Sequence, residues 1–171
     1  MLLHHLRLAL ILLCVVIGAV LHTRLGFGYG AILCYATAVL LTATHFLFGT
    51  VWHAFRELQR GNPEVAERLL SRSTPATLLR SPRAYYHFTQ GMIALQRKEL
   101  ATAEPHLRTA YDLGLRSSDD RALTALNLAH LYLLRKDKQQ SRAWLDRAQS
   151  HPIRDLMLRE NLEKMERVFK V

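Results

Sequence analysis

The chain has 171 residues, of which half are hydrophobic and 22% carry a formal charge, and its formal net charge is +9. This composition argues against an intrinsically disordered chain or a collagen, and two cysteines are too few for a disulfide scaffold. The charge is distributed unevenly. Residues 1–55 hold two basic side chains, Arg7 and Arg24, and no acid, so nearly all charges lie in residues 56–171.

Two uncharged stretches predict a pair of membrane-spanning helices. Residues 8–23 and 25–55 contain no Asp, Glu, Lys or Arg. About 20 consecutive apolar residues cross a bilayer, and the first stretch reaches that length if Arg7 extends to the headgroups. We therefore expect a transmembrane helical hairpin in residues 1–52, with helices over about 6–23 and 30–52. A signal peptide is the alternative for the first stretch, but Ala19 fits a cleavage site poorly.

Basic residues after the second stretch predict the orientation of this hairpin. They are Arg56, Arg60, Arg68 and Arg72. Because basic residues favour the cytoplasmic side, we predict a multi-pass protein of the bacterial inner (cytoplasmic) membrane, with both termini in the cytoplasm. The same four arginines are expected to meet anionic lipid headgroups. Elsewhere basic and acidic residues alternate, so nucleic acid is an unlikely partner.

Residues 53–171 show helical periodicity and an internal repeat. Gly91, Ala103, Leu107 and Ala110 recur 38 positions later as Ala129, Ser141, Leu145 and Ala148. A weaker copy, Ala54, Ala66 and Leu70, precedes the first by 37 positions. A fixed period of small and large residues predicts a solenoid of antiparallel helix pairs, in which the small residues allow two helices to approach closely.

This pattern resembles the tetratricopeptide repeat superfamily. The best copy has Ala129 and Tyr132 in its first helix, then Ser141, Leu145 and Ala148 in its second, with Pro152 at the end. The period of 38 exceeds the family's usual 34, and the first-helix tryptophan of the family is missing from the two better copies. The resemblance implies an all-α domain over residues 53–171, with about three repeats and a capping helix over 153–170.

The resemblance also implies a concave groove lined by the first helix of each pair. Carried onto this chain, the face that lines the groove holds Tyr85, Phe88, Met92, Leu95, Gln96, Leu123, Leu126, Asn127, His130, Leu133 and Leu134; all but Leu123 and Leu134 are taken as partner-binding residues. Most are apolar and so suit an amphipathic or hydrophobic segment. Asn127 matches one position of the family's carboxylate clamp, but the basic residues of that clamp are absent. Packing within the chain is the alternative, since residues 122–134 are apolar nearly all round.

Local signals predict where these helices begin and end. Asn62, Ser81, Asp137 and either Asp119 or Asp120 are expected as N-caps. Gly114 is expected to end a helix, Pro105 to kink one or delay its start, and the second uncharged helix to continue without a break through Arg60.

No catalytic motif is present, and the protein is not expected to be an enzyme. The nine histidines are dispersed, with no acid or cysteine at ligand spacing, so neither a metal nor a cofactor is predicted. His45 is the one ionisable residue well inside the second uncharged stretch.

We therefore expect a membrane-anchored adaptor or scaffold that recruits or organises partner proteins of a membrane complex. By analogy it would be an assembly factor, an accessory subunit or part of an exopolysaccharide secretion machinery. The alternative is a small integral-membrane subunit with a cofactor or proton role through His45.

Overall fold

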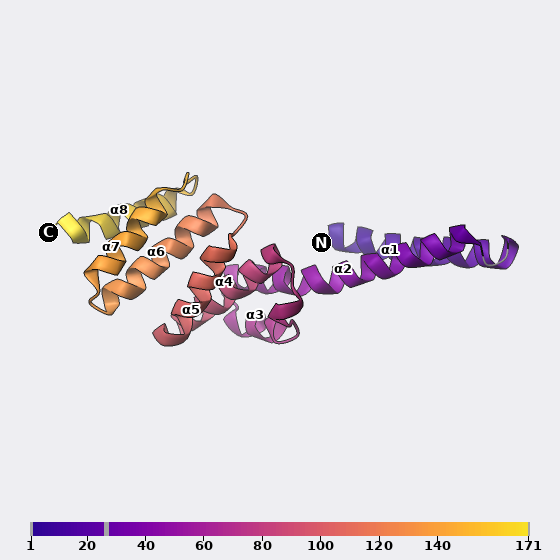
Figure 1. The fold of residues 1–171 in the computed structure, drawn as a ribbon, viewed down its shortest axis with the longest axis horizontal. Helices are drawn as coiled ribbons and strands as arrows, with labels where there is room; N and C mark the ends of the chain where they lie inside the picture. Colours follow the sequence, from indigo (N-terminus) through magenta and orange to yellow (C-terminus); the bar gives the residue numbers. More distant parts are fainter. Residues whose placement is uncertain (1, 26–27, 171) are drawn as a thin grey trace. The chain divides into compact units, whose positions relative to one another are not determined.

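A computed structural model describes residues 2–25 and 28–170 of the chain, with side chains described for 10–24, 28–40 and 50–169. Those residues form eight α-helices and one short 3₁₀ helix, and they contain no strand (Figure 1). The predicted all-α fold class is therefore confirmed. The structure separates into two compact units, residues 1–49 and 50–171, where the sequence predicted a boundary between residues 52 and 53.

The first unit contains α1 (Leu2–Leu25) and the beginning of α2 (Tyr29–Gln59). Small residues lie where these helices meet. A Cβ atom added to Gly18 would lie 3.0 Å from the Tyr35 ring and 3.2 Å from Cys34 Cβ, and Ala31 and Ala38 are buried. The helix α2 continues without a break to Gln59, as the uninterrupted helical periodicity predicted.

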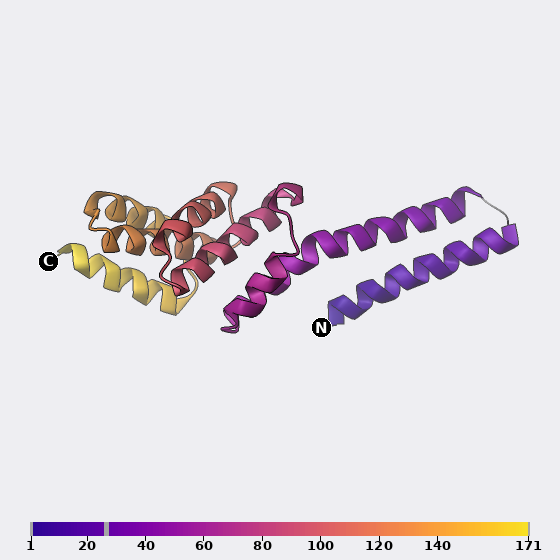
Figure 2. The same cartoon turned by 90° about the horizontal axis from the view of Figure 1, so that it is seen from below.

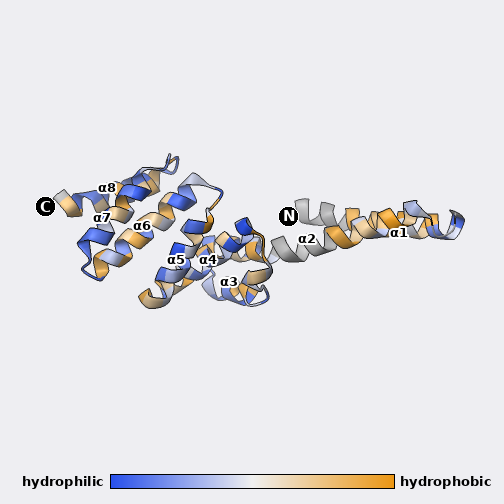
Figure 3. Ribbon diagram, viewed as in Figure 1, coloured by the Kyte–Doolittle hydropathy of each residue, from blue (hydrophilic) through white to orange (hydrophobic). Residues whose placement is uncertain are grey.

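The prediction of a transmembrane hairpin is wrong. A bilayer crossing needs about 20 consecutive, mostly apolar residues. Across the residues that the structure describes, no helix is long and apolar enough to meet that need. The uncharged runs with described side chains, residues 10–23 and 28–40, are shorter. Their surface is nevertheless apolar, with Leu12 and Val39 about two-thirds exposed (Figure 3).

The same finding corrects the predictions that depended on that hairpin. These are the assignments as a membrane protein with transmembrane helices, the multi-pass location in the bacterial inner membrane, and the cytoplasmic placement of both termini.

The second unit contains the end of α2 and six further α-helices. They are α3 (Pro63–Leu70), α4 (Arg80–Gln96), α5 (Leu100–Leu113), α6 (Ser118–Leu134), α7 (Lys138–Gln149) and α8 (Leu156–Lys170), with the 3₁₀ helix η1 (Pro75–Thr77) before α4. The most extensive packing joins α4 to α5 and α6 to α7. The helix α5 also contacts α6, and α8 packs against both α6 and α7 (Figure 2).

The repeated small residues lie where paired helices approach most closely. A Cβ atom added to Gly91 of α4 would lie 2.7 Å from both Cγ and Cδ2 of Leu107 in α5. In the next pair, the Ser141 hydroxyl of α7 donates a hydrogen bond of 2.7 Å to the carbonyl oxygen of Ala129 in α6. Every repeat position is buried: Ala54, Ala66, Leu70, Gly91, Ala103, Leu107, Ala110, Ala129, Ser141, Leu145 and Ala148.

The turns inside the three pairs repeat one backbone geometry. Gly61, Lys98 and Lys136 occupy equivalent positions and have φ angles of +82°, +62° and +63°. In each turn the next residue's N–H donates to a carbonyl five residues back, at 2.9 Å for Asn62 to Glu57 and for Glu99 to Ala94. This is the Schellman arrangement, whose left-handed position favours glycine. Two of the three turns therefore hold a lysine in a conformation that costs it about 1–2 kcal/mol.

Replacing either lysine by glycine is expected to stabilise the fold. Lys98→Gly and Lys136→Gly relieve the left-handed strain but add freedom to the unfolded chain, so we expect a net gain of about 0.5–1 kcal/mol each. Urea denaturation followed by circular dichroism measures it. The control is Glu160→Gly at an exposed position inside α8, which should lose about 1 kcal/mol. A loss for both lysine variants would contradict the repeated-turn geometry.

Several predicted helix ends are confirmed. Asn62 is the N-cap of α3 with Pro63 directly after it, although its side chain donates to Glu57 Oε2 instead of capping the helix. Gly114 ends α5 with a φ angle of +85°. The Asp137 carboxylate caps α7 by accepting from the N–H of Gln140 at 3.0 Å.

Other predicted helix ends are wrong. The helix α4 begins at Arg80, before Ser81, and Ser117 caps α6 in place of Asp119 or Asp120. Pro105 lies inside α5 and does not delay its start at Leu100, so of the two predicted effects the delayed start is wrong and the kink stays a prediction. The last helix begins at Leu156 rather than 153, and its buried face is Leu158, Leu162 and Met165.

Candidate partner-binding groove

A groove with a volume of about 130 Å³ lies in the second unit, between the end of α2, α4 and α6. The groove is lined by side chains from all three of these helices, which lie in different parts of the sequence. The residues that line the groove are Phe55, Leu58, Gln59, Phe88, Met92, Gln96, Asp120 and Leu123. They are mainly apolar, with two amides and a single carboxylate.

Asp120 is the only charged residue among those lining residues. The Tyr85 hydroxyl donates to its Oδ2 atom at 2.7 Å. Burial raises the pKa of the Asp120 carboxyl, and the nearby Asp119 adds to the rise, while the hydrogen bond from Tyr85 opposes it. Burial and this carboxylate together raise the pKa of Tyr85 to about 12. The groove therefore holds a desolvated acidic group in a chain of net charge +9.

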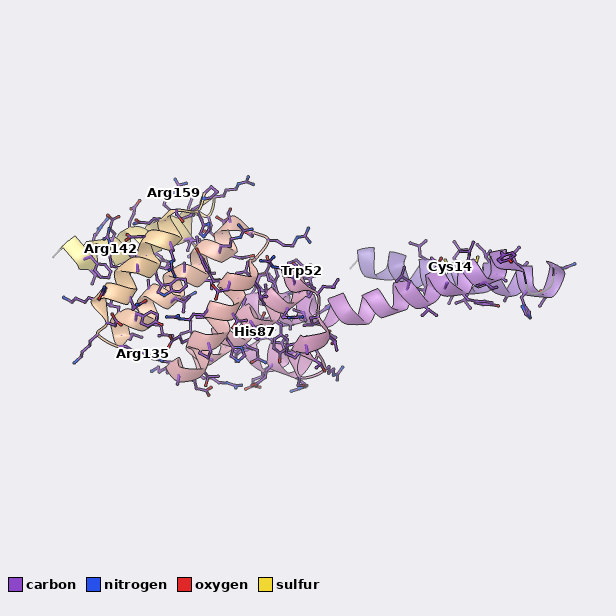
Figure 4. The ribbon with its side chains drawn as sticks, viewed as in Figure 1. Cys14, Trp52, His87, Arg135, Arg142 and Arg159 are labelled. Carbon is purple, nitrogen blue, oxygen red and sulfur yellow. The ribbon has the colours of Figure 1, made fainter. Side chains whose placement is uncertain are left out.

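An aromatic cluster lies beside this carboxylate. The Trp52 ring stacks on Phe55 with ring centres 5.3 Å apart and meets the Tyr85 ring edge-on at 4.8 Å. Phe55 in turn contacts Phe88, with ring centres 5.8 Å apart. Trp52, labelled in Figure 4, remains 42% exposed. Such a partly exposed aromatic ring attracts cationic side chains.

Four of the predicted groove residues, Phe88, Met92, Gln96 and Leu123, line the groove. Tyr85 is buried and reaches the groove only through its hydrogen bond to Asp120. Asn127 donates to the carbonyl oxygen of Leu123 at 2.9 Å and lies 3.3 Å from the sulfur of Met92.

The remaining predicted residues do not line the groove. Leu126 is buried, Leu95 and Leu133 pack against the core, and His130 and Leu134 are exposed. The alternative of packing within the chain thus describes Leu95, Leu126 and Leu133.

Four lining residues were missing from the prediction: Phe55, Leu58, Gln59 and Asp120. The repeat itself carried a signal for three of them. At the offset of 37, Phe55 corresponds to Met92, Leu58 to Leu95 and Gln59 to Gln96. Applying the groove positions to the weakest copy would have found all three.

The four arginines predicted to meet lipid headgroups, Arg56, Arg60, Arg68 and Arg72, are exposed. Arg60, directly after the end of α2, forms an ion pair of 2.6 Å with Glu57 of that helix. Their expected role rested on a neighbouring transmembrane hairpin, which the structure does not support. The side chain of His45 lies outside the described residues.

A polar network joins α5 to α6 away from the groove. The Glu104 carboxylate accepts hydrogen bonds from the Tyr132 hydroxyl and the Arg135 guanidinium, and Arg108 lies 3.3 Å away. Arg108 also donates to the Tyr132 hydroxyl. The hydrogen bond from Tyr132 is the largest of the effects that lower the pKa of Glu104.

Replacing Glu104 is expected to weaken the fold in a pH-dependent way. A carboxylate with a lowered pKa contributes stability above its unfolded pKa, about 4.5, and that contribution is lost as the pH falls through its folded pKa. Glu104→Gln should therefore cost about 1–2 kcal/mol at pH 7 and progressively less below pH 4.5. Urea denaturation at pH 7 and pH 3.5 measures the difference, with Glu160→Gln as the exposed control. An equal cost at both pH values would contradict this assignment.

Within the described part of the chain, no three His, Cys, Asp or Glu side chains come together as a metal site would require. Both Cys14 and Cys34 are free thiols. Comparison with models of protein families, with curated proteins and with solved structures found no match to this chain.

Proposed function

We propose that the chain is an adaptor of the tetratricopeptide-repeat type. The end of α2 with α3, α4 with α5, and α6 with α7 would form three stacked helix pairs, closed by α8. The support comes from the repeated small residues at the helix contacts and from the three equivalent turns at Gly61, Lys98 and Lys136. A stack of this kind presents an extended surface made by the first helices of its pairs.

The proposed work of this surface is binding rather than catalysis: it recruits or organises a partner protein of a larger complex. The observation that carries the proposal is the groove itself, in which three first helices converge on apolar side chains that stay partly open, such as Met92 and Leu123. Helical segments bind in grooves of this kind by burying their apolar face.

The chemistry of the groove also favours one class of partner segment. Its apolar walls suit an apolar helix face, while Asp120, the one charged residue in its lining, suits a basic side chain. A basic segment would otherwise be repelled by a chain of this net charge, so the carboxylate supplies specificity more than affinity. We therefore propose an amphipathic partner segment that carries a lysine or arginine.

Site-specific photo-crosslinking tests this function. A photoreactive residue at Gln96, in the groove, is compared in living cells with one at Gln139, an exposed position on α7. We expect a crosslinked partner at Gln96 and none at Gln139. Mass spectrometry of the crosslinked peptide should show apolar residues with a basic one.

A matched pair of groove variants gives the control. Met92→Lys puts a positive charge in the groove, which repels the basic side chain of the proposed partner. It should reduce the crosslink at least tenfold, which corresponds to a loss of about 1.4 kcal/mol in binding free energy. Met92→Leu keeps the apolar wall and should leave the crosslink within twofold. A crosslink that survives Met92→Lys, or a captured segment that is acidic, would contradict the proposed groove.

A further inference from the structure

Two histidines that are 19 positions apart in the sequence meet between α4 and α5. The Nδ1 atom of His87 lies 3.0 Å from the Nδ1 atom of His106, and their ring centres are 5.2 Å apart. Both side chains are half-buried. Figure 4 labels His87, which projects from α4 one turn before Gly91, where the two helices approach most closely. One N–H bridges the two rings in this arrangement, and each Nδ1 atom can offer a lone pair to a metal ion once it is deprotonated and its ring has turned toward that ion.

The other helix pairs fill these two positions differently. The offset of 38 relates His87 to Ala125 and His106 to Trp144, and both of those residues are buried. In the first pair the equivalent residues are Thr50 and Leu69, and Leu69 packs against the core. A large apolar side chain therefore suffices for packing at the second position. Two facing imidazoles are unnecessary for the fold, and half-burying them carries a desolvation cost.

The two nitrogens lie close enough together to bind one metal ion as adjacent ligands, once both rings turn so that their lone pairs converge on it. An ion about 2.05 Å from each nitrogen, an ordinary metal–imidazole distance, would make an N–metal–N angle of roughly 95° at a separation of 3.0 Å. That angle suits the square-planar or tetragonal geometry of Cu²⁺ and Ni²⁺ better than the tetrahedral geometry of Zn²⁺.

We propose that His87 and His106 form a two-imidazole binding site for a late first-row divalent metal ion, with Cu²⁺ bound most tightly. Imidazole nitrogens suit these ions, and affinity for a given nitrogen site peaks at Cu²⁺. Water would complete the coordination, because the pair is half-exposed and no third His, Cys, Asp or Glu joins it among the described residues. The site is independent of the proposed partner groove.

The surroundings of the pair favour neutral imidazoles, which metal binding requires. Burial lowers the pKa of His87, with smaller contributions from His106 and Arg83, and burial alone lowers the pKa of His106. Arg83 also repels a bound cation, although its guanidinium is held by the carbonyl oxygen of Leu78 at 2.9 Å. This repulsion reduces the affinity expected for the ion.

Copper titration of the full chain tests the proposal. Cu²⁺ binding is measured by calorimetry and electron paramagnetic resonance for the unmodified chain and for His87→Gln and His106→Gln. The exposed His130 supplies the matched control, His130→Gln. We expect each of the two pair variants to lose one equivalent of bound Cu²⁺, or to bind it at least tenfold more weakly. The control should keep it.

A second variant removes both histidines and is designed to keep the fold. The double substitution H87A with H106W installs the residues that the next helix pair uses at these positions, so it should fold normally. Cu²⁺ should raise the thermal midpoint of the unmodified chain by bridging α4 and α5, and leave that of the double variant unchanged. The same stoichiometry and the same thermal shift in all chains would overturn the proposal.

Discussion

Gly91→Ala is expected to destabilise the second unit by about 2–3 kcal/mol, although alanine favours a helix over glycine by roughly 0.5–1 kcal/mol. The added methyl group would lie 2.7 Å from two side-chain carbons of Leu107 and 3.2 Å from its backbone nitrogen. Leu107 is fully buried and cannot turn away freely, so α4 and α5 must separate. Urea denaturation followed by circular dichroism measures the loss.

A double-mutant cycle tests the cause of that loss. Leu107→Ala alone should cost about 2–5 kcal/mol by leaving a cavity, and the added methyl group should then find room. Gly91→Ala combined with Leu107→Ala should therefore cost clearly less than the two single changes added together. Additive costs would show that the methyl group does not act on Leu107. The control is Ala129→Gly at the equivalent position, which should lose only about 1 kcal/mol of helix propensity.

The contact between Gly91 and Leu107 also shows what the sequence could reveal. Small residues at a fixed offset identify helix contacts because close approach excludes side chains, and Gly91 and Ser141 lie at such contacts. Helix ends were harder to predict, because several polar residues compete for one cap. Ser117 caps α6 although Asp119 and Asp120 follow directly.

The candidate groove was predictable only in part. The groove face implied by the family resemblance places Phe88, Met92, Gln96 and Leu123 correctly. Asp120 was missed as a groove residue because it lies at the first turn of α6, where an acid is readily explained as a helix cap. The contact between His87 and His106 could not be predicted from the sequence at all. Nothing in their spacing relates them, and only the packing of α4 on α5 brings them together.

Tyr85→Phe is the second change with a large expected effect, a loss of about 1.5–3 kcal/mol at pH 7. It removes the hydroxyl that donates to Asp120 at 2.7 Å and leaves a desolvated carboxylate without that donor. Asp120→Asn should not lower the stability of the fold. Its amide oxygen can still accept from Tyr85, and the cost of burying a charge disappears, so stability at pH 7 should equal or exceed that of the unmodified chain.

The pH dependence separates this explanation from a simple loss of packing. Because the folded-state pKa of Asp120 is raised, its contribution to stability is present below its unfolded pKa of about 3.8 and is lost as the pH rises through the folded value. The missing donor matters most when the carboxylate is ionised. The cost of Tyr85→Phe should therefore be largest at pH 7 and shrink at pH 3.5, whereas Tyr86→Phe at the next position should be insensitive to pH.

Measuring both changes together with partner crosslinking at Gln96 connects stability to function. If Asp120 serves to recognise a basic partner residue, Asp120→Asn should leave the fold as stable as before yet reduce the crosslink roughly tenfold, because a neutral amide attracts a cation weakly. A group that is retained at a cost to stability indicates a binding role. A stable Asp120→Asn chain that crosslinks fully would remove the argument for a basic partner while leaving the apolar groove in place.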